Sequence, residues 1–106
     1  MNFMYKIEVC CPENSVENLR KAIADNGGGS VNGYTNCSFV TPGYSYFMPT
    51  EEANPYVGEK FKLNKILEYK IEVVCSGEIL NNLVQTIKDV HPYEEVIVNT
   101  YKLINM

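Results

Sequence analysis

The residues best suited to chemistry lie in one short segment, HPYEE at residues 91–95. The imidazole of His91 beside the carboxylates of Glu94 and Glu95 could bind a divalent metal or carry out acid–base chemistry. A structural role is the alternative, in which His91 ends a helix, Pro92 and Tyr93 set a turn and the glutamates face solvent. Three residues in so short a turn rarely converge on one metal. The sequence therefore favours the structural role unless a second subunit supplies ligands.

The four cysteines, at positions 10, 11, 37 and 75, are the other candidate reactive groups. Their spacing contains no C-x-x-C pair and matches no zinc-ribbon pattern. In a cytoplasmic protein these thiols are expected to be reduced. Cys37 has no base near it in the sequence, so a cysteine-nucleophile enzyme is not indicated.

The composition of the chain argues against several classes of protein. The chain has 106 residues, which predicts one domain over 1–106. Its 13 acidic residues outnumber 9 basic ones, so there is no basic stripe for nucleic acid or for an anionic membrane surface. No segment has the roughly 20 apolar residues that span a bilayer, and no signal peptide is recognisable at residues 1–6. We expect a cytoplasmic protein with no membrane or nucleic-acid partner.

Two similar segments of the chain are expected to form the elements that position these candidate reactive residues. YKIEVCC at residues 5–11 returns as YKIEVVC at residues 69–75, and both alternate as a strand with one covered face does. Each is followed by helical periodicity, over residues 16–26 and 79–90. The repeat predicts two βαβ halves, residues 3–33 and 67–104.

A long insertion, residues 34–66, separates the halves. Its pattern predicts a strand over 36–41, a turn at Pro42-Gly43, a returning strand over 44–48 and a loop over 50–58. Four of the eight tyrosines lie in this insertion. An aromatic hairpin that projects from a small domain cannot bury itself, so we expect it to pack on another subunit or over a ligand.

Four ordered motifs then carry a family resemblance: NCSFVT at 36–41, FMP at 47–49, ANPYVG at 53–58 and HPYEE at 91–95. Together they resemble the PII/CutA-like domain that is inserted in the dinuclear-metal-centre proteins of the Nif-three-like (YqfO-type) family. The resemblance covers nearly the whole chain. It implies an α+β, ferredoxin-like βαββαβ sandwich with an extended β-hairpin, assembled as a homotrimer. Full-length relatives carry their two-metal site in a separate domain, so hydrolase activity is not carried over to this chain.

In a ferredoxin-like sheet the two repeated strands are central neighbours. We expect them to be parallel, which would bring Cys11 and Cys75 together, either as a redox or soft-metal pair or, as we favour, as two small buried side chains. Lys6, Glu8, Lys70 and Glu72 are expected on the uncovered face, either as a salt-bridged surface or around a charged ligand.

The leading hypothesis is a non-enzymatic oligomer that binds a small molecule, a divalent metal or a partner protein between subunits. The motifs supply the ligand-binding candidates, which are Cys37, Ser38, Phe39, Tyr46, Phe47, Asn54, Pro55, Tyr56 and Tyr93. The metal candidates are His91, Glu94 and Glu95. One alternative is a metal-dependent enzyme centred on His91 and completed by glutamates of neighbouring chains, among them Glu51 and Glu52. Another is a purely structural interaction module.

Overall fold

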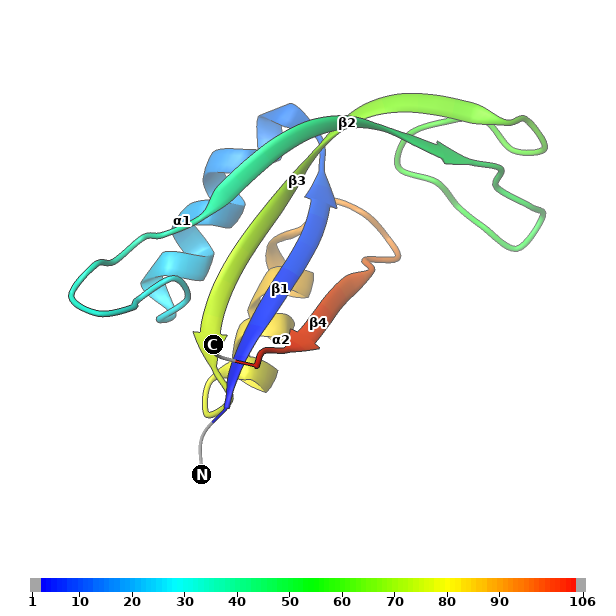
Figure 1. Ribbon diagram of the computed structural model, residues 1–106. Coiled ribbons are helices and arrows are strands. Elements are labelled where there is room, and N and C mark those ends of the chain that lie inside the picture. Colours follow the sequence, from blue (N-terminus) through cyan, green and yellow to red (C-terminus); the bar gives the residue numbers. More distant parts are fainter. Residues whose placement is uncertain (1–2, 105–106) are drawn as a thin grey trace.

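Four antiparallel strands form a single sheet, and both helices lie on one face of it (Figure 1). The computed structural model describes residues 3–104. In chain order the elements are β1 (Met4–Cys11), the 3-10 turn η1 (Glu13–Ser15), α1 (Val16–Asp25), β2 (Phe39–Phe47), β3 (Asn64–Ser76), α2 (Leu80–Val90) and β4 (Val98–Lys102). The strand order is β2-β3-β1-β4. The predicted ferredoxin-like βαββαβ fold is confirmed.

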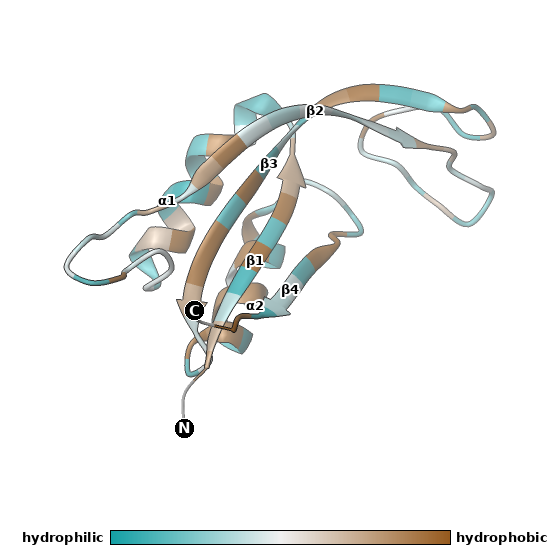
Figure 2. Cartoon of the chain, viewed as in Figure 1, coloured by the Kyte–Doolittle hydropathy of each residue, from teal (hydrophilic) through white to brown (hydrophobic). Residues whose placement is uncertain are grey.

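The core lies between the two helices and the central strands. Leu19 and Ile23 of α1 and Leu83 and Ile87 of α2 are at most 2% exposed. They pack against the inward residues of β1 and β3, which are Ile7, Val9, Cys11, Ile71, Val73 and Cys75. The alternation that predicted one covered face is visible as bands along both strands in Figure 2. Burial of these side chains is the main stabilising contribution to the fold.

The central strands run in opposite directions, so the expectation of parallel neighbours is wrong. Tyr5 pairs with Cys75 at one end of the β1–β3 ladder, and Cys11 pairs with Tyr69 at the other. In a ferredoxin-like sheet the parallel relation joins the two strands of one βαβ half, and a strand of the other half lies between them. The repeated segments are therefore antiparallel neighbours.

Strand β2 passes straight through Pro42-Gly43, so the predicted turn there is also wrong. Pro42 pairs with Tyr69 and Gly43 with Glu68 in one unbroken ladder. A proline is tolerated because β2 is an edge strand, where a missing N–H need not break a hydrogen bond to a neighbour. The chain reverses instead over residues 48–63, between β2 and β3.

The hairpin of β2 and β3 extends well past the helices and gives the molecule its length of 46 Å, against 26 and 24 Å in the other directions (Figure 1). We call this extension, residues 42–68, the arm. The rest of the sheet with its two helices is the body. The arm overlaps the predicted insertion, residues 34–66, over residues 42–66.

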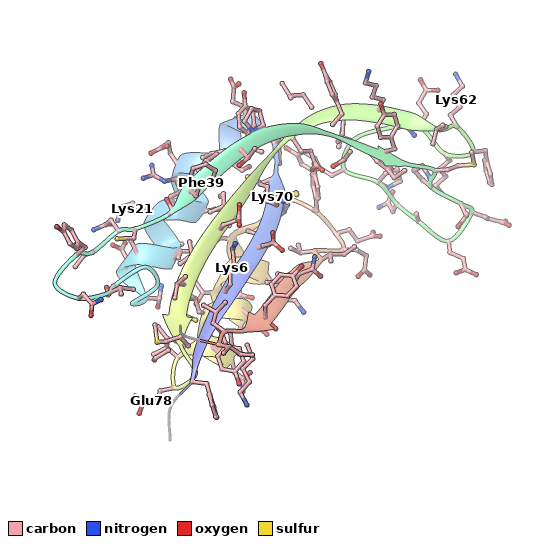
Figure 3. The ribbon with its side chains drawn as sticks, in the orientation of Figure 1. Lys6, Lys21, Phe39, Lys62, Lys70 and Glu78 are labelled. Carbon is pink, nitrogen blue, oxygen red and sulfur yellow. The ribbon has the colours of Figure 1, made fainter. Side chains whose placement is uncertain are left out.

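The face of the body sheet that turns away from the helices carries paired charges. Lys6 Nζ lies 2.5 Å from a carboxylate oxygen of Glu72, and Lys70 Nζ lies 3.5 Å from one of Glu8. Figure 3 shows Lys6 and Lys70 on this open face. The expected salt-bridged surface is present.

Candidate functional site

The arm loop and the turn after α2 meet in space. The rings of Tyr56 and Tyr93 have centroids 5.7 Å apart. The backbone N–H of Asn54 donates to a carboxylate oxygen of Glu94 at 3.4 Å. Between these segments and the first residues of β3 lies a cavity of about 340 Å³, which we call the arm pocket. Several of the motif residues therefore meet within a single chain, while a site shared between subunits stays a prediction.

The wall of the arm pocket is mainly apolar. Rings of Phe47, Tyr56 and Tyr93 line it, together with the side chains of Ile66 and Ile97. Phe47 and Ile66 lie on the open face of the sheet because they alternate with residues that point to the helix side. Aromatic walls around a few polar groups are typical of small-molecule sites.

The buried polar residue of the arm pocket is Glu68, which is only 7% exposed. The hydroxyl of Tyr93 donates to one of its oxygens at 2.5 Å, and the hydroxyl of Ser45 donates to the other. A carboxylate is buried at high cost unless it is hydrogen-bonded, and these two hydroxyls offset part of that cost.

The position of Glu68 explains why no lysine within residues 3–104 pairs with it. Glu68, Lys70 and Glu72 follow one another on the open face of β3. Lys70 and Glu72 have charged partners on β1, but the β1–β3 ladder ends at the Cys11–Tyr69 pair. Glu68 lies just beyond that end, so its partners come from β2 and from the turn after α2.

Tyr93 is a hydrogen-bond donor in this site. Burial raises the pKa of its hydroxyl, and the bond to the Glu68 carboxylate raises it further. The phenol therefore keeps its proton over the physiological range and donates it to Glu68.

His91 fixes the turn that carries Tyr93. Its ring is 6% exposed, and its Nε2 donates to the carbonyl oxygen of Cys10 at 2.8 Å. The backbone N–H of Tyr93 donates to the Nδ1 atom at 3.1 Å. Both ring nitrogens are therefore engaged with the backbone, which ties the end of α2 to the end of β1.

The metal candidates separate within one chain. Glu94 and Glu95 are exposed at the rim of the arm pocket, whereas His91 points to Cys10. Across residues 3–104, no three histidine, cysteine or acidic side chains come together as a metal-binding group. A metal site completed by another subunit stays a prediction.

The arm loop is held by Asn64 and by a glycine. The Asn64 amide donates to the carbonyl oxygens of Glu59 and Lys62, both at 2.9 Å, and accepts from the N–H of Glu59 at 3.1 Å. Gly58 has φ +99°, and a Cβ there would lie 2.9 Å from the ring of Phe47. The loop therefore needs glycine to approach the pocket wall.

Of the nine ligand-binding candidates, Phe47, Asn54, Pro55, Tyr56 and Tyr93 line the arm pocket. The other four lie elsewhere. Cys37 and Ser38 border a depression of about 180 Å³ beside α1, where the Arg20 Nε donates to the Ser38 hydroxyl at 3.0 Å. With Phe39 they also line a second hollow, of about 460 Å³.

The last two candidates, Phe39 and Tyr46, are exposed on β2. Phe39 pairs with Glu72 on the open face of the body. Tyr46 points away from the arm pocket because it alternates with Phe47.

The cysteines do not form a pair. Cys11 and Cys75 are both buried, but the antiparallel register offsets them by six positions along the strand, roughly 20 Å. Burial raises the pKa of the Cys11 thiol to about 11, which keeps it protonated and unreactive. The favoured expectation, two small buried side chains, matches this arrangement.

Sequence reasoning missed Glu68 and Ser45. The signal available was weak: Glu68 continues the alternating charges of β3, and only the end of the β1 ladder distinguishes it from Lys70 and Glu72. The sequence pattern places Ser45 in the predicted returning strand over 44–48 and indicates no partner for it. Its role follows from the register in which Gly43 lies opposite Glu68.

The sequence and the fold of the chain are similar to those of several known proteins. No protein-family model matches the chain. A protein of Listeria innocua named GTP cyclohydrolase 1 type 2 homolog is 40% identical over 99 residues, which cover 92% of this chain and 26% of the relative. The crystal structure of a Bacillus cereus protein related to NIF3 superposes with a TM-score of 0.85 at 30% identity, over 98% of this chain and 26% of that one. The chain is therefore similar in sequence and fold to one segment of these longer proteins.

The chain therefore spans about a quarter of the length of these NIF3-related relatives. The divalent cation tolerance protein CutA of Archaeoglobus fulgidus matches over most of both chains, 97% of this one and 86% of its own, with a TM-score of 0.72 at 15% identity. This second likeness shows that the fold of the segment is the CutA fold.

Proposed function

We propose that this NIF3-related chain is a non-enzymatic binding module of the PII/CutA-like type, and that it binds a small molecule in the arm pocket. The observation that carries the proposal is the buried carboxylate of Glu68 at an otherwise apolar, aromatic cavity. Burying a charged carboxylate costs free energy. A ligand that bonds to this carboxylate inside the cavity would offset part of that cost, which favours binding there. Five of the nine ligand-binding candidates line the same cavity.

A binding role fits the polar groups better than a catalytic one. His91 bonds the backbone through both ring nitrogens, and the Tyr93 hydroxyl is engaged with Glu68. Each of these groups supports the shape of the pocket. The relatives' name refers to GTP cyclohydrolase 1 type 2, and that activity is not part of the proposal for this segment.

The proposal includes assembly as a homotrimer in the cytoplasm. The helix side of the arm exposes Tyr44 (63%), Tyr46 (61%) and Leu67 (48%), an apolar surface suited to a neighbouring subunit or to a partner protein. All four cysteines are unpaired thiols, which supports the proposed reducing compartment. Within residues 3–104, no helix is long and apolar enough to cross a membrane.

Native mass spectrometry of the protein purified without added metal or chelator tests the assembly. We expect a trimer, and any bound mass would distinguish an organic ligand from a divalent metal. A metal in the trimer that the His91→Ala variant lost would favour the interface enzyme instead. A monomer at all accessible concentrations would remove the assembly from the proposal.

A fragment screen followed by amide NMR shifts tests the pocket. Bound fragments should shift the amides of Phe47, Tyr56 and Tyr93, and the Tyr56→Ala variant should lose these shifts. Tyr34→Ala is the matched control, because Tyr34 is 74% exposed and lies outside the pocket. Fragments that shift only amides elsewhere, or none, would show that the arm pocket is not a binding site.

A further inference from the structure

The charges around the arm pocket are of one sign. Its lining includes three carboxylates, Glu68, Glu94 and Glu95, and no lysine or arginine among the described residues. The next cation on the same face of β3, Lys70, is paired with Glu8. A ligand in this pocket therefore meets negative charge without a compensating cation.

Glu68 is the charge that a ligand would engage directly. Within residues 3–104, Glu68 accepts hydrogen bonds from the neutral hydroxyls of Ser45 and Tyr93 and forms no salt bridge. A carboxylate offers about four acceptor sites, so two hydroxyls leave capacity for further donors. A protonated amine supplies both the donors and the opposite charge, and such bonds are about twice as strong as neutral ones.

The walls add a second preference for a cation with an apolar body. The faces and edges of Phe47, Tyr56 and Tyr93 offer aromatic contact, and an ammonium group near such rings gains cation–π attraction. A volume of about 340 Å³ is at the small end of ordinary ligand sites. It suits one ring with a short side chain.

Building on the proposed function, we propose that the arm pocket selects small amphipathic amines, with the ring or hydrocarbon body against the aromatic wall and the ammonium on Glu68. Phosphorylated and carboxylated compounds are excluded, because they need arginine, lysine or a helix N-terminus and would here face three carboxylates.

Three probes of matched size test the selection: 2-phenylethylamine, 2-phenylethanol and 3-phenylpropionate, each titrated into the whole chain at neutral pH and followed by amide NMR shifts. We expect the amine to shift the amides of Phe47, Tyr56 and Glu68 and to bind about tenfold more tightly than the alcohol, the gain of one charge-assisted hydrogen bond. The propionate should bind more weakly than the alcohol.

Glu68→Gln should bring the affinity for the amine down to that for the alcohol, while the alcohol still binds and so reports an intact pocket. Glu52→Gln is the matched control, since it removes one negative charge from the arm outside the pocket and should change neither affinity. If Glu68→Gln unfolds, Glu95→Gln replaces it, and this rim variant should weaken the amine about twofold and leave the alcohol unchanged.

The two proposals fail in different ways. Binding of the alcohol or the propionate in the pocket with no preference for the amine would overturn the selection and leave the binding site. Pocket amides that respond to none of the three probes would overturn both proposals.

Discussion

The body and the arm share strand β3 but bury opposite faces of it. In the body, the helix side is buried, and Ile71, Val73 and Cys75 are at most 3% exposed. In the arm, Leu67 points to the same side and is 48% exposed, while Glu68 on the other side is 7% exposed. The buried face changes where the helices end and where the arm loop and the turn after α2 begin to cover the open side. What covers a strand, more than its own alternation, decides which side is the inside.

Because of this difference, replacing leucine by alanine should lower the free energy of unfolding much more in the body than in the arm. Two leucine variants test this expectation. Leu83→Ala in the body removes a fully buried side chain and should lower the free energy of unfolding by about 3 kcal/mol. Leu67→Ala in the arm should change it by less than about 0.5 kcal/mol in the monomer. Urea unfolding compares the two variants. A large, concentration-dependent loss for Leu67→Ala would show that another subunit covers the arm.

A substitution at the junction of body and arm should have an effect on stability between these two. His91→Ala removes two hydrogen bonds to a buried ring and should cost about 2 kcal/mol, measured by thermal or urea unfolding. His91→Gln is the control, because its amide can still donate to the carbonyl of Cys10, and it should recover part of the loss. An unchanged stability in His91→Ala would mean that the turn holds its position without the imidazole.

Removing the Tyr93 hydroxyl tests the arm pocket without changing its shape. Tyr93→Phe should lose about 1 kcal/mol of stability at neutral pH, because the buried Glu68 loses a donor. Tyr44→Phe, an exposed ring on the helix side of the arm, is the matched control and should change nothing. Urea unfolding of both variants gives the comparison.

The Tyr93→Phe variant should also change how the stability of the fold depends on pH. The folded-state pKa of Tyr93 is raised, so its contribution is complete below the pKa of an unfolded tyrosine, about 10, and is lost as the pH rises above that value. Wild-type stability should fall in this alkaline range, and Tyr93→Phe should fall less steeply. Part of the decline should persist, because the pKa of Cys11 is also raised. Equal alkaline slopes would contradict the assignment.

The smallest effect is expected on the open face of the body. Lys6→Gln removes a solvent-accessible ion pair with Glu72 and should shift the unfolding midpoint only slightly, with the difference vanishing at high salt. A large loss that salt does not reduce would show that a second copy buries this face. The body would then bury both faces of its sheet in the assembled protein.

Much of the body could be predicted from sequence because its signals are local. The predicted helices over residues 16–26 and 79–90 agree to within one residue with α1 and α2, since apolar spacing marks both. The relative direction of β1 and β3 could not be read from their own residues, because it depends on how the two halves combine. Similarly, Pro42-Gly43 has the composition of a turn, and only its place on an edge strand makes an extended conformation acceptable.

The candidate site was predicted in part. The motifs pointed to the loop around Tyr56 and to the turn around Tyr93, and these do meet. Glu68 could not be predicted from the sequence because the segments that bury it lie far away along the chain. Cys37 and Ser38 were grouped with the site through the motifs alone, and the structure places them beside α1 instead.

Proline at position 42 also bears on how the sheet meets other sheets. An edge strand presents a row of free backbone donors and acceptors that an extended segment of another molecule can join. Along β2 that row lacks a donor at Pro42, near the middle of the strand, and the opposite edge, β4, has only five residues. Neither edge is a good template for a long incoming strand. The protein can therefore carry an arm rich in exposed tyrosine with a reduced risk of polymerising into fibres.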